Sequence, residues 1–135
     1  MYGIPVVERS TTFVNQVKTI RAHTPLPLFQ DEFRTPISLH DAAKACLLAA
    51  RSDLAGLLHV GGPERLSRLD MGRITAKWLR ATDENIVAIR QADGAAPEPR
   101  PPDVSLDCRK FEGHFGHSPG RPMSESLAAI EQDGA

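Results

Sequence analysis

The sequence lacks most of the features that assign a function directly. It has only two cysteines in 135 residues, Cys46 and Cys108. Neither lies in a CxxC or CxxH pattern, so we expect reduced thiols and no redox or zinc site. Sixteen Lys and Arg against seventeen Asp and Glu give a formal charge of −1, which provides no global field for nucleic acid or an acidic membrane. Any anion must therefore be bound by individual arginines.

Long apolar runs are missing too. No run approaches the ~20 apolar residues that a membrane helix requires. The amino terminus shows no basic segment followed by the apolar stretch of a signal peptide. We therefore predict a cytoplasmic protein with no membrane partner. The length of 135 residues suits a single domain covering residues 1–135.

The histidines and serines form no recognisable catalytic constellation. No serine lies in a GxSxG nucleophile elbow, which argues against a hydrolase. His59 lies in an apolar run and is predicted to be a hydrogen-bonded core residue. His114 and His117 are three residues apart, but neighbouring Gly and Pro residues and the lack of a third ligand argue against a metal site. We expect these two histidines on a surface loop.

Hydrophobic periodicity predicts alternating strands and helices. Extended segments are expected at 1–7, 24–29, 33–39, 57–60, 84–90 and 103–107, and helices at 10–22, 42–50, 67–78, 108–113 and 124–131. The helix starts carry capping residues: Ser10 or Thr11, then Asp41, then Ser67 with Asp70 three places on. This order indicates an α/β domain rather than a helical bundle.

Two arginines are candidates for binding an anion. Arg34 lies in an extended segment just before Pro36, and Arg100 lies in a proline-rich loop, so each guanidinium is held at reduced entropic cost. Two such groups suit a diphosphate. Solvated loop arginines are the alternative. Gly61-Gly62-Pro63 is read as a turn, since it matches no phosphate-binding fingerprint, and Pro97–Pro102 is an alternative polyproline ligand.

Several segments, in the same order, resemble the dTDP-4-dehydrorhamnose reductase group of the extended short-chain dehydrogenases, within the NAD-dependent epimerase/dehydratase family. The resemblance rests on Tyr2-Gly3, Thr12-Phe13, Asp31–Pro36, Asp41-Ala42-Ala43, the strand-turn-helix at 57–79, and the arginine-proline loop, strand and helix at 100–119. It implies an α/β fold, namely the carboxy-terminal substrate-binding lobe of an extended Rossmann-type dehydrogenase without the dinucleotide-binding half. The resemblance also implies a nucleotide-sugar ligand, with Arg100, Arg34, Phe33 and Thr12 as substrate-binding residues.

The catalytic and cofactor motifs of this family are missing from the chain. No GxxGxxG turn is present, so we expect no cofactor to be bound by this chain alone, although the intact family uses NAD(P). The family's YxxxK pair has no counterpart, because the only tyrosine, Tyr2, is followed four residues later by Val6. We therefore predict no catalytic residue, no catalysis by the chain alone, and a Rossmann-type half or a homo-oligomer as partner.

Other readings of the resemblance stay open. Arg34 stands where the rhamnose reductases usually show Gly, so the resemblance does not identify the sugar. The stretch at 106–112 also resembles the non-catalytic regulatory beta subunit of methionine adenosyltransferase, which makes a regulatory or interaction module the alternative function. A poorly folding remnant with exposed apolar faces is a third reading.

Overall fold

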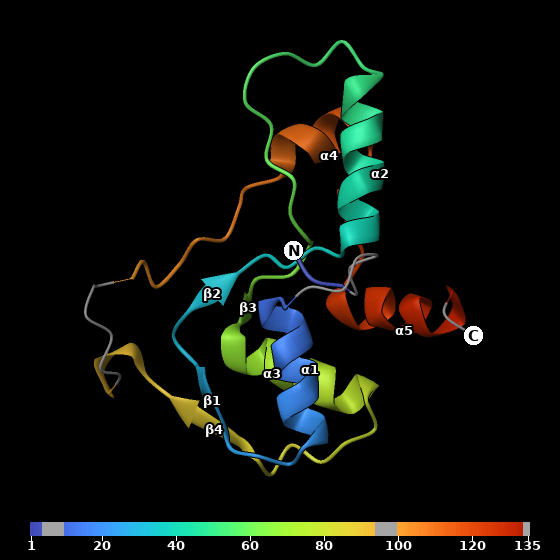
Figure 1. Cartoon of the computed structure of the whole chain (residues 1–135). Helices are drawn as coiled ribbons and strands as arrows, with labels where there is room; N and C mark the ends of the chain where they lie inside the picture. The colour runs from blue at the N-terminus through green and yellow to red at the C-terminus, as the bar shows by residue number, and fades with distance from the viewer. Residues whose placement is uncertain (4–9, 94–99, 134–135) are drawn as a thin grey trace. The chain divides into compact units, whose positions relative to one another are not determined.

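The computed structural model describes residues 1–3, 10–93 and 100–133, and it forms two compact units (Figure 1). Unit 1 consists of 1–3, 35–65 and 105–135, and unit 2 of 4–34 and 66–104. Each unit therefore combines segments that lie far apart in the sequence.

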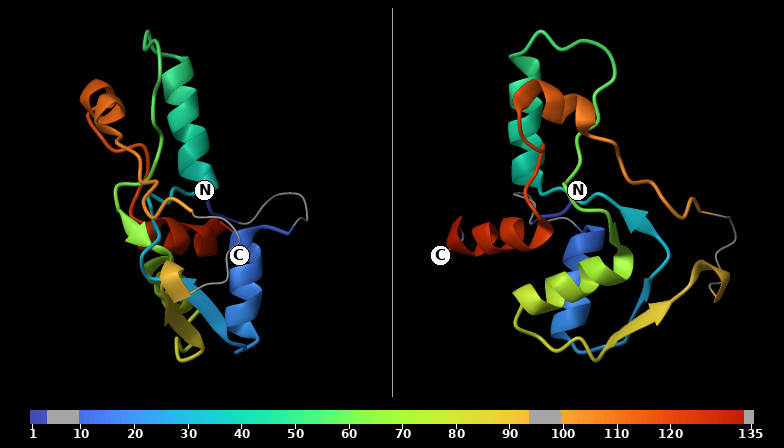
Figure 2. Two further views of the ribbon diagram at one scale, coloured as in Figure 1. Left: turned by 90° about the vertical axis from the view of Figure 1, so that its left-hand side faces the viewer. Right: turned by 180° about the vertical axis from the view of Figure 1, so that it is seen from behind.

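Unit 2 is a small α/β arrangement built on parallel strands. Strand β1 (Leu26–Phe29) pairs in parallel with β4 (Ile86–Ile89), with Leu26 opposite Ile86. Strand β2 (Phe33–Arg34) pairs antiparallel with β3 (Leu66–Ser67), and a short 3₁₀ helix, η1, covers Gln91–Asp93. Helices α1 (Thr12–Arg21) and α3 (Arg68–Trp78) contact each other and β1 (Figures 1 and 2). These contacts confirm the α/β class.

Local sequence signals explain both helices of unit 2. The Thr11 side chain accepts a hydrogen bond from the Val14 amide, which caps α1 as predicted. At α3, Ser67 and Asp70 exchange hydrogen bonds in a full capping box, again as predicted. Gly72 permits the close packing of α3, because a Cβ there would collide with the Leu28 side chain.

Unit 1 contains three helices around a core of large apolar side chains. They are α2 (Leu39–Ala50), α4 (Arg109–Phe115) and α5 (Met123–Asp133). Its buried apolar residues are Tyr2, Ile37, Ala42, Ala45, Cys108, Phe111, Met123 and Leu127. Tyr2 also forms a parallel bridge with Ser38, which joins the chain start to the residues that precede α2.

The start of α2 corrects one prediction. Ser38, not Asp41, is the N-cap, and its Oγ accepts a hydrogen bond from the Asp41 amide at 3.0 Å. Asp41 lies one turn inside the helix, where its carboxylate binds Arg121 instead. Sequence favoured Asp41 because both residue types cap helices.

Two predicted strands do not form. Residues 57–60 are not a strand, and Leu57 is 78% exposed rather than buried. His59 is half-buried, and its Nδ1 lies 3.1 Å from the Asp107 carbonyl oxygen, so it is not a core residue. In the segment 103–107 only Asp103 forms a bridge, with Phe33. A strand requires a neighbour for its backbone groups, which apolar patterning alone does not guarantee.

The remaining elements lie close to their predicted positions. β1, β4, α4 and α5 fall within or beside the expected ranges. The surface-loop prediction is wrong for His114, which lies in α4, whereas His117 follows the left-handed Gly116, so the two histidines do not share a helix. Of the extended segment expected at 1–7, residues 4–7 lie outside the described residues. Within the described part of the chain, no helix is long and apolar enough to span a membrane.

Candidate functional site

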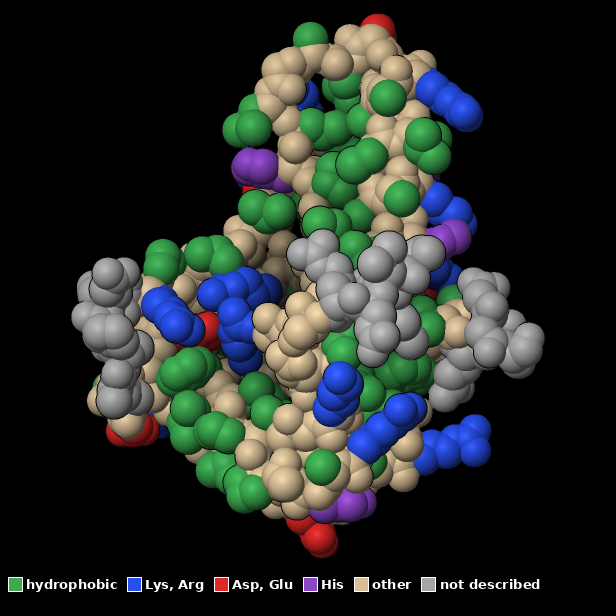
Figure 3. Space-filling view, in the orientation of Figure 1, with side chains coloured by type: hydrophobic (Ala, Val, Ile, Leu, Met, Phe, Trp, Pro, Cys, Tyr) green, Lys and Arg blue, Asp and Glu red, His purple; other side chains and the backbone are tan. Residues whose placement is uncertain are grey.

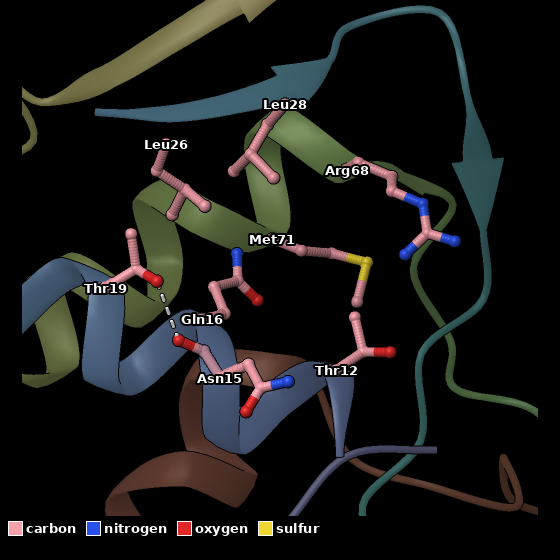
Figure 4. Close-up of a pocket in the computed structure, with 8 residues that line it drawn as sticks. All are labelled: Thr12, Asn15, Gln16, Thr19, Leu26, Leu28, Arg68 and Met71. Carbon is pink, nitrogen blue, oxygen red and sulfur yellow. Dashed lines mark hydrogen bonds between the residues drawn. The ribbon is translucent and has the colours of Figure 1, made fainter. Parts of the chain in front are cut away.

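Unit 2 contains a pocket of about 280 Å³ between its two helices and β1 (Figure 4). It is lined by Thr12, Asn15, Gln16 and Thr19 of α1, Leu26 and Leu28 of β1, and Arg68 and Met71 of α3. The α1 wall is therefore polar and uncharged, whereas the β1 wall is apolar. In the close-up, Arg68 and Thr12 lie toward one end of the pocket, with the Met71 side chain extending between them.

Arg68 is oriented by a buried carboxylate. Its Nε donates a hydrogen bond to Glu32 Oε2 at 2.9 Å, and Glu32 is 0% exposed. Gln91 Nε2 donates to the other oxygen of Glu32 at 3.2 Å. Burial raises the pKa of Glu32, but hydrogen bonds from Arg68 and Gln91 outweigh it, and the net pKa is lowered. Glu32 is thus ionised at neutral pH and holds Arg68 in place.

The anchoring of Arg68 leaves part of its guanidinium available. Only Nε is hydrogen-bonded among the residues that the structure describes, and the side chain is 34% exposed. A guanidinium offers five N–H donors in a planar fork that matches phosphate oxygens. Because Arg34 Nη2 also lies 3.4 Å from Glu32 Oε2, two arginines oppose one carboxylate. This local excess of positive charge favours an anionic ligand.

The four predicted substrate-binding residues occupy different places. Thr12 lines the pocket. Arg34 is 24% exposed and donates to Glu32 and to the Phe33 carbonyl, so it braces the carboxylate that holds Arg68. Phe33 is half-buried, and its backbone pairs with Pro102 and Val104. Arg100 is exposed and is not among the residues that line the pocket.

Sequence reasoning missed the two residues at the centre of this arrangement. Glu32 falls between the strands predicted at 24–29 and 33–39, where no pattern marks it for burial, yet it is completely buried. Arg68 was treated only as part of a helix, although its place directly after the Ser67 cap is a local signal for a helix amino terminus. The 36-residue separation of Glu32 and Arg68 leaves no signal for their pairing. The predicted polyproline ligand falls partly on residues 97–99, outside the described residues.

Tyr2 and the glycine turn both have structural roles. Tyr2 is 3% exposed, its hydroxyl donates to the Met123 carbonyl at 3.4 Å, and burial raises its pKa. At the turn, a Cβ on Gly62 would overlap the Pro36 carbonyl, and one on Gly61 would approach Thr35 Oγ1 to 2.8 Å. These glycines let two backbone segments approach closely, which accounts for the turn by packing.

A second cavity, in unit 1, lies beside the ion pair of Asp41 with Arg121. It has a volume of about 500 Å³ and is lined by Asp41, Lys44, Ala45, Leu48, Pro63 and residues 117–122. Asp41 binds Arg121 through Nε and Nη2 and also accepts a hydrogen bond from Ser126 at 2.7 Å. Burial opposes ionisation, but the bonds from Arg121 and Ser126 lower the pKa of Asp41 to about 2. Arg121 therefore has a structural role, because it joins the segment before α5 to α2.

Comparison with known proteins places the α/β arrangement in the class of sugar-nucleotide reductase-like substrate-binding domains. The chain belongs to the family described as the RmlD substrate binding domain, whose model matches residues 6–133. A similar curated protein is the probable low-salt glycan biosynthesis reductase Agl14 of Haloferax volcanii, 27% identical over 113 residues. That match covers 84% of this chain and 37% of the reductase.

Solved structures support the same fold. The dTDP-4-dehydrorhamnose reductase of Bacillus anthracis, in complex with NADP, aligns with a TM-score of 0.79 at 13% identity, over 93% of this chain and 44% of that one. The corresponding enzyme of Clostridium acetobutylicum gives 0.78 at 18% identity, with the same coverage. This chain therefore spans less than half the length of the reductases it matches, and it corresponds to their carboxy-terminal part.

Proposed function

We propose that this chain binds the nucleotide-sugar substrate of an NAD(P)-dependent reductase of the dTDP-4-dehydrorhamnose reductase type. The pocket of unit 2 holds part of the nucleotide, with Arg68 directed at a phosphate. The cofactor, when bound by an intact reductase, supplies the hydride. This chain binds and orients the substrate but supplies no proton donor, and it is not catalytically competent alone.

The proposal rests on the guanidinium of Arg68, which lines a pocket with one apolar and one polar wall. Its Nε is bonded to Glu32, and among the described residues its two Nη groups remain available for a ligand. Ligand pockets usually start at about 300 Å³, so a volume of about 280 Å³ suits one portion of a nucleotide-sugar rather than the whole molecule. The apolar side chains Leu26 and Leu28 suit the face of a base, and the α1 amides suit its polar edge. Prior orientation by Glu32 reduces the entropy lost on binding.

Calorimetry on the full chain tests the proposal with dTDP, dTDP-glucose, UDP-glucose and NADPH as ligands. We expect binding of at least one nucleotide or nucleotide-sugar and none of NADPH. Arg68→Met should weaken that binding roughly 10- to 100-fold, or about 1.4–2.8 kcal/mol, because a charge-assisted contact is lost. Arg73→Met is the matched control, since Arg73 lies on the same helix but pairs with exposed Asp83. Equal effects of the two variants would contradict the assignment.

Variants of Arg100 and Arg34 test the substrate-binding roles that the sequence predicts for these residues. If Arg100 contacts the diphosphate, Arg100→Ala should weaken nucleotide-sugar binding by about 1.5–3 kcal/mol. An unchanged affinity would assign Arg100 to solvent. Arg34→Ala should have a smaller effect, because Arg34 acts through Glu32 rather than on the ligand.

The same titration addresses the alternative of a regulatory module. A regulatory module resembling the methionine adenosyltransferase beta subunit predicts a folded chain that acts through a partner protein. A chain that is stable in thermal denaturation but binds none of the four ligands would favour that alternative over the substrate-binding proposal.

A further inference from the structure

Helix α1 presents a stripe of uncharged polar side chains to the pocket of unit 2. The stripe consists of Thr12, Asn15, Gln16 and Thr19. Its spacing of i, i+3, i+4 and i+7 places the four side chains on one face of the helix. Such a polar face usually points only to solvent, but this one lines a pocket opposite apolar side chains of β1. A few polar groups in an otherwise apolar pocket commonly fix the orientation of a ligand.

Gln16 differs from its neighbours on this stripe because its amide is free. Asn15 Oδ1 accepts a hydrogen bond from Ser10 Oγ at 2.9 Å, and Thr19 Oγ1 donates to the Asn15 carbonyl at 2.9 Å. The Gln16 side chain is half-buried, and it makes no hydrogen bond to any residue that the structure describes. Its Oε1 acceptor and its Nε2 donor are therefore both available, and a ligand that pairs with them replaces only water.

Gly72 of α3 provides the space in which the Gln16 amide lies. A Cβ on Gly72 would approach Gln16 Nε2 to 3.1 Å and would collide with the Leu28 side chain. In Figure 4 the Gln16 side chain points from α1 toward α3, with Leu26 and Leu28 on β1 beside it. The free amide therefore lies next to two apolar side chains. A flat ring can pack against these side chains while its polar edge meets the amide.

The charges of unit 2 define which end of the pocket faces the phosphates. Figure 3 shows Lys and Arg side chains gathered over β2 and β3, and Arg68 directly follows β3. In Figure 4 Arg68 and Thr12 lie toward one end of the pocket, and Thr19 and Leu26 lie toward the other. Gln16 is one helical turn, or about 6 Å, along α1 from Thr12. A nucleotide with its phosphates at Arg68 therefore extends its base toward Gln16.

We propose that Gln16 sets the base preference of the pocket by reading the edge of an imide base, such as thymine or uracil. Its Oε1 accepts the ring N–H and its Nε2 donates to the neighbouring carbonyl oxygen, because a carboxamide offers one acceptor and one donor side by side. Leu26 and Leu28 contact the face of the ring. A site that hydrogen-bonds a ligand N–H discriminates against an analogue that lacks it, since the polar group of the site is left unpaired. This inference rests on the proposed function.

Calorimetry with dTDP and its N3-methyl derivative gives the first test, on the unaltered chain. The two ligands differ only at the ring N–H, which the methyl group replaces. We expect the chain to bind dTDP at least tenfold more tightly than N3-methyl-dTDP. Equal affinities for the two ligands would overturn the proposal. This comparison needs no variant, so a folding defect cannot obscure it.

The variant Gln16→Met assigns the difference between the ligands to one side chain. Methionine has nearly the length of glutamine but neither its acceptor nor its N–H donors, so the variant should bind the two ligands within twofold of each other. Gln30→Met is the matched control, since Gln30 is exposed and does not line the pocket. The control should keep the full preference for dTDP. A preference that survives in Gln16→Met would show that another group reads the base, and would overturn the proposal.

The variant Arg68→Met separates the role of Gln16 from the proposed function. It should weaken the binding of both ligands by the same factor and leave their ratio unchanged, because Arg68 is directed at a phosphate. A chain that binds dTDP through Arg68 but does not distinguish the methylated ligand would overturn only the role of Gln16. A chain that binds neither ligand would overturn that role together with the proposed function.

Discussion

Each unit buries a carboxylate beside an arginine from a distant part of the chain, but the two pairs have different consequences. In unit 1, Arg121 gives both Nε and Nη2 to Asp41, and its backbone amide lies 3.4 Å from the same carboxylate. In unit 2, Arg68 gives only Nε to Glu32. The first pair ties the residues before α5 to α2. The second positions a guanidinium at a pocket.

The difference shows that a buried ion pair does not by itself identify a site. Both carboxylates have a lowered pKa with hydrogen-bonded arginines among the causes. What separates them is the number of bonds that the arginine makes to its carboxylate: Arg121 uses two guanidinium nitrogens and Arg68 uses one, and within the described part of the chain both Nη groups of Arg68 remain available. Four predictions test this distinction, beginning with the largest expected effect.

Asp41→Asn should lower the free energy of unfolding by about 3 kcal/mol, because the buried carboxylate loses its charge-assisted hydrogen bonds from Arg121 and Ser126. The variant also removes a negative charge from the first turn of α2. Urea denaturation measures the change. Nucleotide-sugar affinity should remain within twofold. A variant that loses affinity as well as stability would contradict the separation of the two roles.

The free energy of unfolding should depend on pH through the ionisation of Asp41. The pKa of Asp41 is about 2 in the folded chain against a reference of 3.8. A depressed folded pKa contributes stability that is present above pH ~4 and is lost as pH falls toward 2, by on the order of 2 kcal/mol. Urea midpoints across this range measure it. Asp41→Asn should lack that part of the acid sensitivity, and identical pH profiles would refute the assignment.

Glu32→Gln should weaken nucleotide-sugar binding about tenfold, equivalent to about 1.4 kcal/mol. The amide keeps the shape of the side chain but no longer holds Arg68 by charge. Calorimetry gives the affinity, and thermal denaturation shows whether the variant folds. A double mutant with Arg68→Met should be no weaker than Arg68→Met alone, because Glu32 acts through that arginine. Additive losses would point to an independent role for Glu32.

Ser67→Ala should cost about 1 kcal/mol of stability, because it removes the side-chain half of the α3 capping box. Urea denaturation measures this loss too. The expected effect on ligand affinity is small, since Arg68 is oriented mainly by Glu32. Thr11→Ala at α1 is the matched comparison, with one capping bond instead of a reciprocal pair. A larger loss at Thr11 than at Ser67 would contradict this ranking.

The amino-acid sequence by itself determined the elements whose signals are local. Thr11 and Ser67 cap the helices predicted to follow them, and the apolar runs at 26–29 and 86–89 form strands. The order of motifs was enough to indicate the family. Such features depend on residues within a turn or two of each other, so short-range spacing contains the information.

Only the tertiary structure decided which arginine faces the pocket and which segments pair. Arg34 and Arg100 stood out in sequence through neighbouring prolines, yet Arg68 lines the cavity because Glu32 is buried beside it. Residues 57–60 have the composition of a buried strand but pair with no strand among the described residues. Burial and backbone pairing depend on segments distant in sequence, and no local pattern specifies them.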